Sequence, residues 1–311
     1  MNQFEMSATC SGHFTIEKID SENNVIERYN KPNLITDNGL LELSKSGFVD
    51  CYVGLFTDAT PVTSTKLTAP TDRLVSGNMY SYGTVTNELH PISKEFTVTH
   101  TFESLITNGT AAKNYNRIGV IKNNTLVAIS TIVNDRGEEV TISLNANDRI
   151  RVIYVFKLTV PTADVVFNNV DLGKLGTTNV TIRPTNLDSP NTEFKNRGLI
   201  IQNSSMYISN GNLEEINTRL SNNDKVQNTI RTGITAITSL SPNVATTLLT
   251  TGLLYSDPMS PATGRKDGYS LFIIPTSLFW YQIKFGKGLD YISNKVNLLF
   301  NLTFTLRRAG G

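Results

Sequence analysis

Few residues of this sequence have the types and spacing that catalysis requires. The three histidines, His13, His90 and His100, belong to no His-Glu-x-x-His or Cys-x-x-Cys pattern, so a zinc site is not expected. The chain also lacks the Gly-x-Ser-x-Gly turn of serine hydrolases and the Gly-x-x-x-x-Gly-Lys-Ser/Thr loop that cradles phosphates. We interpret His100, on the apolar side of an alternating segment, as a core or interface histidine, and the other two as loop residues.

Acidic pairs of the glycosidase kind could be proposed from Glu214, Glu215 or Asp257. Glu214 and Glu215 are neighbours, and on the helix predicted for their segment they point to different sides, so they cannot flank one glycosidic bond. No carboxylate pair therefore supports a depolymerase or glycosidase. We predict that the protein is not an enzyme and has no catalytic, cofactor-binding or metal-binding residue.

The single tryptophan is the best candidate for an exposed aromatic contact. Strand alternation places Trp280 on the side opposite to Phe279 and Tyr281, whose apolar ridge continues through Ile283 and Phe285. If that ridge faces the core, Trp280 faces outward. Three interpretations remain open: packing under a loop or a neighbouring domain, an interface, or a platform on which sugars stack. We take Trp280 and Tyr281 as candidate interface residues.

The composition favours a β-rich protein over a helical bundle. Of 311 residues, 39% are hydrophobic and 18% charged, and the difference is made up by Thr, Asn and Ser, which favour strands, turns and loops. The net charge of +1 gives no electrostatic reason to expect nucleic acid or an acidic membrane as partner. No segment approaches the about 20 apolar residues of a membrane span.

Two cysteines, Cys10 and Cys51, do not make a disulfide framework, so a reducing compartment is expected.

The elements that must position these residues are mostly strands. A long alternating strand closes each half of the chain, over 149–160 and over 296–307, and each follows a polar turn. These strands predict a mainly β fold of two tandem β-sandwich-like domains with a few short helices. We place the domains at 1–161 and 162–311. The two halves match only in how they end, so duplication is a weak hypothesis.

In the first half, alternation and turn residues predict a hairpin over 14–29 and a helix beginning at the cap Asp37. Further strands are predicted over 48–56, 94–102, 118–121, 126–132 and 140–144. Residues 57–92, rich in Thr, Ser, Pro and Gly, are predicted to form a long surface loop that contacts neighbouring proteins.

In the second half, strands are predicted over 165–167, 179–183, 199–201, 206–208, 269–274 and 279–285. Residues 213–220 have the spacing of a helix, and 229–252 are ambiguous between helix and loop. Gly286-Lys-Gly288 is interpreted as a hairpin turn. Residues 210–260 are the second candidate for contacts between proteins.

One combination of motifs resembles a known family. The run Lys31-Pro-Asn-Leu-Ile-Thr-Asp-Asn-Gly-Leu-Leu-Glu-Leu43 is followed by Cys51-Tyr-Val-Gly54 and by the Thr- and Pro-rich segment 60–67. This combination is similar to virion proteins of tailed bacteriophages, described as tail, fibre or collar components. The similarity covers about residues 28–161, including the strand 147–158, and more faintly 279–308. The sequence departs from the family pattern at Leu55-Phe-Thr-Asp58.

The resemblance implies a non-enzymatic structural component of the virion: a tail- or neck-associated adaptor, a collar or a fibre-attachment protein. It carries over no catalytic residue. The implied partners are other tail, neck or fibre proteins and further copies of the same chain. The implied location is the tail or neck region, after assembly in the cytoplasm of the bacterial host. The alternative is a virion module that binds a receptor or a host-surface glycan. Long repeats of a fibre shaft are lacking.

Overall fold

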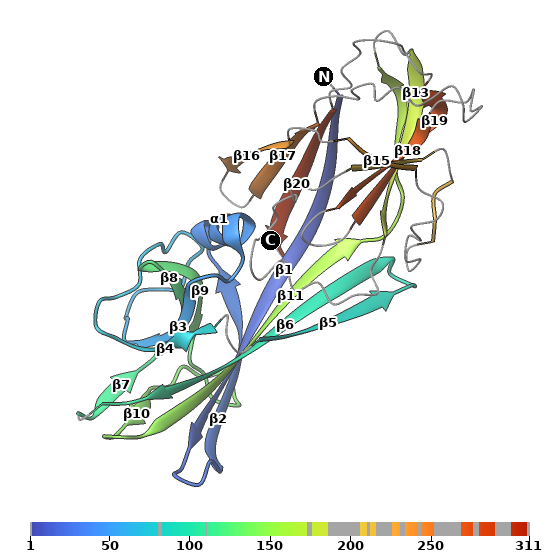
Figure 1. Ribbon diagram of the computed structural model, residues 1–311. Coiled ribbons are helices and arrows are strands. Elements are labelled where there is room, and N and C mark those ends of the chain that lie inside the picture. The colour runs from blue at the N-terminus through green and yellow to red at the C-terminus, as the bar shows by residue number, and fades with distance from the viewer. Residues whose placement is uncertain are drawn as a thin grey trace.

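The computed structural model describes residues 2–79, 83–109, 111–172, 176–185, 206–209, 212–215, 226–230, 234–241, 244–251, 269–275, 280–289 and 300–309. Over these residues the chain is mainly β, and α1 (Asp37–Ser46) is the one α-helix among them. The expected fold class is therefore confirmed (Figure 1).

The strands of the first half are β1 (Asn2–Ile19), β2 (Val25–Ile35), β3 (Cys51–Phe56), β4 (Arg73–Asn78), β5 (Gly83–His90), β6 (Glu95–Thr107), β7 (Lys113–Tyr115), β8 (Arg117–Lys122), β9 (Thr125–Thr131), β10 (Ile142–Leu144) and β11 (Arg149–Pro161). Those of the second half are β12 (Val165–Asp171), β13 (Thr177–Thr185), β14 (Met206–Ser209), β15 (Val226–Ile230), β16 (Ile234–Ser241), β17 (Val244–Thr251), β18 (Tyr269–Pro275), β19 (Trp280–Leu289) and β20 (Phe300–Arg308).

The long first strand, β1, organises the molecule. One of its edges pairs antiparallel with β11 over Thr9–Ile19. The opposite edge pairs with β20, parallel, over Asn2–Cys10, and then with β2, antiparallel, over Gly12–Ile19. The first and last strands of the chain thus lie side by side, and β2 and β20 follow one another along the same edge of β1 (Figure 1).

A β-sandwich forms around the second half of β1. One layer contains β2, β1, β11, β6 and β5, and the other contains β9, β8, β3 and β4. β2 connects the layers because its last residues, Leu34 and Ile35, pair with β9. Phe48, which follows α1, fills the core between them, with its ring centroid 4.7 Å from that of Phe102 and 5.0 Å from that of Phe156.

The predicted alternation of the first closing strand is confirmed, because its even-numbered residues from Ile150 to Val160 are buried. On β6, His100 is fully buried beside Phe102, as its predicted place on the apolar side requires.

In the second half, β12, β13, β19, β18, β14 and β15 form a separate six-stranded sheet. The remaining strands, β16 and β17, pair with β20 and so extend the sheet that contains β1. The second closing strand, predicted over 296–307, is found over residues 300–307 as part of β20, and its beginning lies outside the described residues. Hydrogen bonds therefore connect the predicted domains through β1 and β20, and the division at residue 161 stays a prediction.

Several predicted elements were wrong. The expected loop over 57–92 contains two strands, β4 and β5, and the ambiguous segment 229–252 contains β16 and β17. Both segments are rich in Thr, whose branched side chain favours strands, and this preference was underestimated beside the Ser, Pro and Gly of the same segments. Gly286-Lys-Gly288 lies within β19 instead of forming a turn.

The helix predicted over 213–220 is also wrong for its first residues, 213–215. Residues 212–215 are not helical, because Gln282 of β19 binds the backbone of Glu214 as a neighbouring strand would: Glu214 donates its N–H to Oε1 at 2.8 Å, and its carbonyl accepts from Nε2 at 3.0 Å. Residues 216–220 and the predicted strand 199–201 lie outside the described residues.

Candidate functional site

The motif that carries the family resemblance forms a junction between a strand and a helix. Leu34 and Ile35 end β2 beside β9, and Thr36 caps α1 by accepting a 2.8 Å hydrogen bond from the Gly39 N–H. The Thr36 hydroxyl also donates to the Leu126 carbonyl of β9. The cap is therefore Thr36, not the expected Asp37, because Thr36 keeps the extended backbone that a cap requires.

Gly39 is required by close packing at this junction. A Cβ at this position would lie 1.9 Å from the carbonyl oxygen of Val127, a backbone atom of β9. The leucines Leu40 and Leu43 then point into the core, where both are buried. Thr36 and Gly39 thus fix the start of α1 against β9, and the leucines anchor the helix in the core.

The same junction holds the end of the chain. The guanidinium of Arg308, the last residue of β20, forms an ion pair with Asp37 in the first turn of α1. One residue later, the N–H of Ala309 donates a 2.8 Å hydrogen bond to the carbonyl of Cys10 on β1. The negative charge of Asp37 suits the N-terminus of the helix, so this carboxylate serves the helix and the C-terminal strand together. We call Thr36, Asp37, Gly39 and Arg308 the C-terminal junction.

Residues 57–72 are ordered by contacts within this chain. Asp58 accepts a hydrogen bond from Lys66, and its backbone pairs with the side-chain amide of Asn116 at 2.9 and 3.1 Å. Burial alone would raise the pKa of Asp58, but the hydrogen bonds from Lys66 and Thr60 lower it to about 2. The loop also reaches the C-terminal junction, where the Ser64 carbonyl accepts from the Asp37 N–H at 2.9 Å.

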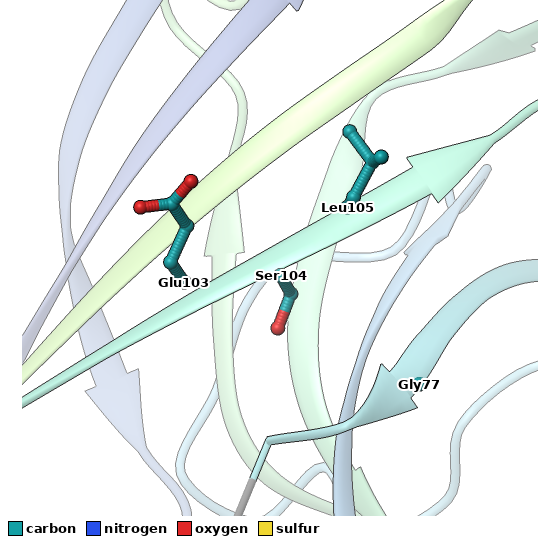
Figure 2. A pocket seen from close by; sticks show the side chains of 4 residues that line it. All are labelled: Gly77, Glu103, Ser104 and Leu105. Carbon is teal, nitrogen blue, oxygen red and sulfur yellow. The ribbon is translucent and has the colours of Figure 1, made fainter. Parts of the chain in front are cut away.

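A hollow of about 520 Å³ lies between β4 and β6. It lies beside the part of β6 that follows Phe102, the residue opposite Gly83 at the start of β5. Figure 2 shows Ser104 pointing from β6 toward Gly77 of β4, whereas Glu103 and Leu105 point to the other side of β6. A hydroxyl nucleophile needs an adjacent base, and the carboxylate of Glu103 points to the side of β6 opposite to Ser104 (Figure 2), so these two residues do not form a nucleophile–base pair.

The outer face of the first layer carries a buried carboxylate. Glu17 of β1 is 1% exposed and lies between Arg28 of β2 and Arg151 of β11, which donate to it at 2.8 and 2.6 Å. Burial would raise the pKa of Glu17, but the hydrogen bonds and charges of Arg151 and Arg28 outweigh it and lower the pKa below its ordinary value. Sequence reasoning missed this cluster because its members are far apart in the chain.

The candidate interface residues lie at the start of β19. Tyr281 is 3% exposed, and Ile283 and Phe285 are fully buried, so the expected apolar ridge of this strand does face the core. Because Tyr281 is buried, its ring could take part in an interface only if the residues packed over it moved away. The side chain of Trp280 lies outside the described part, so its role in an interface or in sugar binding stays a prediction.

The other chemically capable residues do not come together. The three histidines lie on different strands: His13 on β1, His90 at the end of β5 and His100 in the core on β6. Burial raises the pKa of the Cys51 thiol to about 12 and raises that of Cys10 as well, so neither is poised as a nucleophile.

The structure describes only part of the set of carboxylates considered for glycosidase chemistry. Glu214 is held by its backbone against Gln282, and Asp257 lies outside the described residues. Within the described ranges, no group of three or more potential metal ligands occurs. The same part of the chain contains no helix long and apolar enough to cross a membrane.

Comparison with known protein families, with curated proteins and with solved structures finds no match for this chain.

Proposed function

We propose that the protein is a non-enzymatic structural component of a tailed-bacteriophage virion. Within the virion, we place it as a tail- or neck-associated adaptor, a collar or a fibre-attachment protein. The observation that carries the proposal is the C-terminal junction, because the residues that resemble virion proteins are also those that anchor the end of the chain to its beginning.

The strand pattern suits a part that transmits load between other proteins. β1 runs for 18 residues and is bonded along one edge to β11 and along the other to β20 and β2. A force along this strand is shared by many hydrogen bonds at once, so no single bond has to bear it. A structural protein needs such continuity and partner surfaces, whereas a catalytic pocket is not required of it.

The direct test is immunogold electron microscopy of phage particles from the source lysate, with an antibody raised against this chain. Label at the neck, tail or fibres is the expected result, and its position would distinguish adaptor, collar and fibre-attachment roles. Particles that remain unlabelled after mild disruption, alongside a labelled known tail protein, would contradict the proposal.

A further inference from the structure

The strand β2 has one edge that meets another strand only at its end. Its inner edge pairs with β1 from Val25 to Asn33, and its outer edge pairs with β9 through Leu34 and Ile35 alone. Among the residues that the structure describes, 27–31 therefore pair with β1 only. The hairpin of β1 and β2 projects from the lower end of the molecule (Figure 1). The outer edge of this hairpin is a surface that another strand can use.

The backbone groups of Arg28 and Asn30 point to this outer edge. In an antiparallel strand, the N–H and C=O of one residue point to the same side, and the side alternates along the strand. Pro32, opposite His13 of β1, has no N–H, and its carbonyl accepts a 3.2 Å hydrogen bond from the Ser130 hydroxyl of β9. Pro32 thus faces away from β1. Asn30 and Arg28, two and four residues earlier, face the same way.

The open stretch of β2 is limited at both ends by a feature that stops strand pairing. At one end, Pro32 has no N–H to donate. At the other, Ile26 is the extra residue of a bulge, because the register with β1 shifts there. Prolines and bulges are means by which natural sheets protect an edge. The stretch 27–31 remains between them, and Tyr29 is its centre.

The charges of this stretch are arranged symmetrically about Tyr29. When two copies pair antiparallel with Tyr29 on the two-fold axis, Glu27 of each copy lies opposite Lys31 of the other. Opposite charges on directly opposed residues stabilise a pair of strands. Arg28 of each copy lies opposite Asn30 of the other, and these two residues exchange backbone hydrogen bonds because both face the open side.

The neighbouring registers are less favourable. With Arg28 on the axis, two arginines are opposed, and with Glu27 on the axis, two carboxylates are opposed. Like charges in these positions destabilise a pair of strands. With Asn30 on the axis, Arg28 lies opposite Pro32, which cannot donate the hydrogen bond that this position requires. Of the registers compared, the one centred on Tyr29 uses the whole open stretch and opposes no like charges.

We propose that two copies of this chain associate by antiparallel pairing of β2 with β2, with Tyr29 on the two-fold axis. The pairing brings Ile26, which is 58% exposed in the single chain, next to the partner's Pro32. Lys31 disfavours any strand that has no acidic residue opposite it, and Glu27 of a second copy supplies one. The same surface serves both copies, as is usual for a two-fold interface. This dimer specifies the homo-oligomer expected of a virion component, and in that respect it rests on the proposed function.

The first test is the mass of the purified full-length chain in solution, measured by light scattering across a dilution series. A dimer that dissociates on dilution is the expected result. Glu27→Lys places two lysines opposite each other at both ends of the paired stretch, so the dissociation constant should rise by about tenfold. Glu27→Lys combined with Lys31→Glu restores opposite charges in the same register and should return the dissociation constant toward the wild-type value.

This rescue separates pairing between copies from effects within one chain. In the single chain, the Tyr29 hydroxyl donates a hydrogen bond to Glu27, and Lys31→Glu does not restore that contact. The matched control is Glu22→Lys, the same change of charge in the turn before β2 and outside the paired stretch. It should leave the dissociation constant unchanged, and circular dichroism should show every variant folded.

The register is tested by cross-linking under mild oxidation. Tyr29→Cys should give a disulfide-linked dimer, because the two copies of this residue lie directly opposite each other, within the distance that a disulfide spans. Asn30→Cys should not, because its copy lies two residues further along. The native Cys10 and Cys51 are buried and do not compete.

Four results would each overturn the proposal: a wild-type chain that is monomeric at every concentration, a dimer that Glu27→Lys leaves unchanged, a charge swap that does not restore the dimer, or cross-linking through Asn30→Cys in place of Tyr29→Cys. Pairing of β2 with a strand of a different protein would appear as a monomer in the first test. A monomer in solution combined with labelled particles would reject the β2 pairing while leaving the proposed function intact. A dimer with the expected register but no labelled particles would reject the proposed function alone.

Discussion

At the scale of single residues, one buried charge, that of Glu17, is stabilised by partners from the two neighbouring strands. Glu17 is buried, and its two arginines come from the strands on either side of β1. A buried carboxylate is costly unless it is paired, so the alignment of β2, β1 and β11 and the ionisation of Glu17 depend on one another. This coupling makes the sheet sensitive to pH at one defined position.

Replacing Glu17 by Gln should lower the free energy of unfolding at neutral pH by about 1–2 kcal/mol, because a neutral amide binds two arginines less well. The folded-state pKa of Glu17 is lowered, so its contribution is present above the ordinary value of 4.5 and is lost as the pH falls toward the lower folded value. Urea unfolding from neutral to acidic pH should therefore show the two proteins converging. The control is Glu103→Gln, which changes an exposed carboxylate of β6 on the same face of the layer as Glu17. A difference in unfolding free energy between Glu17→Gln and the wild type that stays constant at all pH values would contradict the assignment.

Gly39→Ala should destabilise the fold although Ala is ordinarily the better helix residue. The added Cβ would meet the Val127 carbonyl at 1.9 Å, and overpacking against backbone costs about 1–3 kcal/mol. Gly77→Ala is a matched control, since a Cβ there meets nothing within 4 Å. Thermal unfolding followed by circular dichroism measures both. Equal melting temperatures for the two variants would show that α1 can shift away from β9.

At the scale of elements, α1 is placed where the two ends of the chain meet. It packs against β9 of the sandwich and against β17 and β20 of the second half. The helix itself could be predicted from Leu40, Leu41 and Leu43, because its apolar spacing is local. That α1 contacts β20 could not be predicted. The Asp37–Arg308 pair joins residues far apart in the sequence, and no local pattern shows that two such residues meet.

The contribution of this ion pair can be measured with a double-mutant cycle. Asp37→Asn and Arg308→Gln should each lower stability, and the double variant should lose less than the sum, with a coupling energy of about 1–3 kcal/mol. Urea unfolding of the four proteins gives the coupling. Hydrogen exchange should show faster exchange in β20 for each single variant. Additive losses would mean that the two side chains do not interact in solution.

At the scale of the whole molecule, strands with a long, regular apolar face could be predicted and shorter strands rich in Thr could not. The alternation in β6 and β11 identifies them because each buries every second residue. By contrast, β5 and β17 are rich in Thr, so they resemble loops in composition until a neighbouring strand is known. Pairing between β1 and β20 could not be predicted from the sequence either, because its residues also lie at opposite ends of the chain. Parallel pairing needs a crossover, and its partner can be anywhere in the chain.

The closing strand offers a test of how independently the two halves fold. Removing residues 300–311 takes away the strand that pairs with Asn2–Cys10 and leaves the pairing of Gly12–Ile19 with β2 and β11 unchanged. If residues 1–161 form a domain, hydrogen exchange followed by mass spectrometry should show lost protection at the beginning of β1 and in β17. Protection of β6, β8 and β11 should be retained, because their neighbours remain in place. The variant Arg308→Gln, which keeps β20, separates loss of the strand from loss of its ion pair. Lost protection throughout the sandwich would instead show that the chain unfolds as one unit, with β1 and β20 joining its two halves into a single cooperative structure.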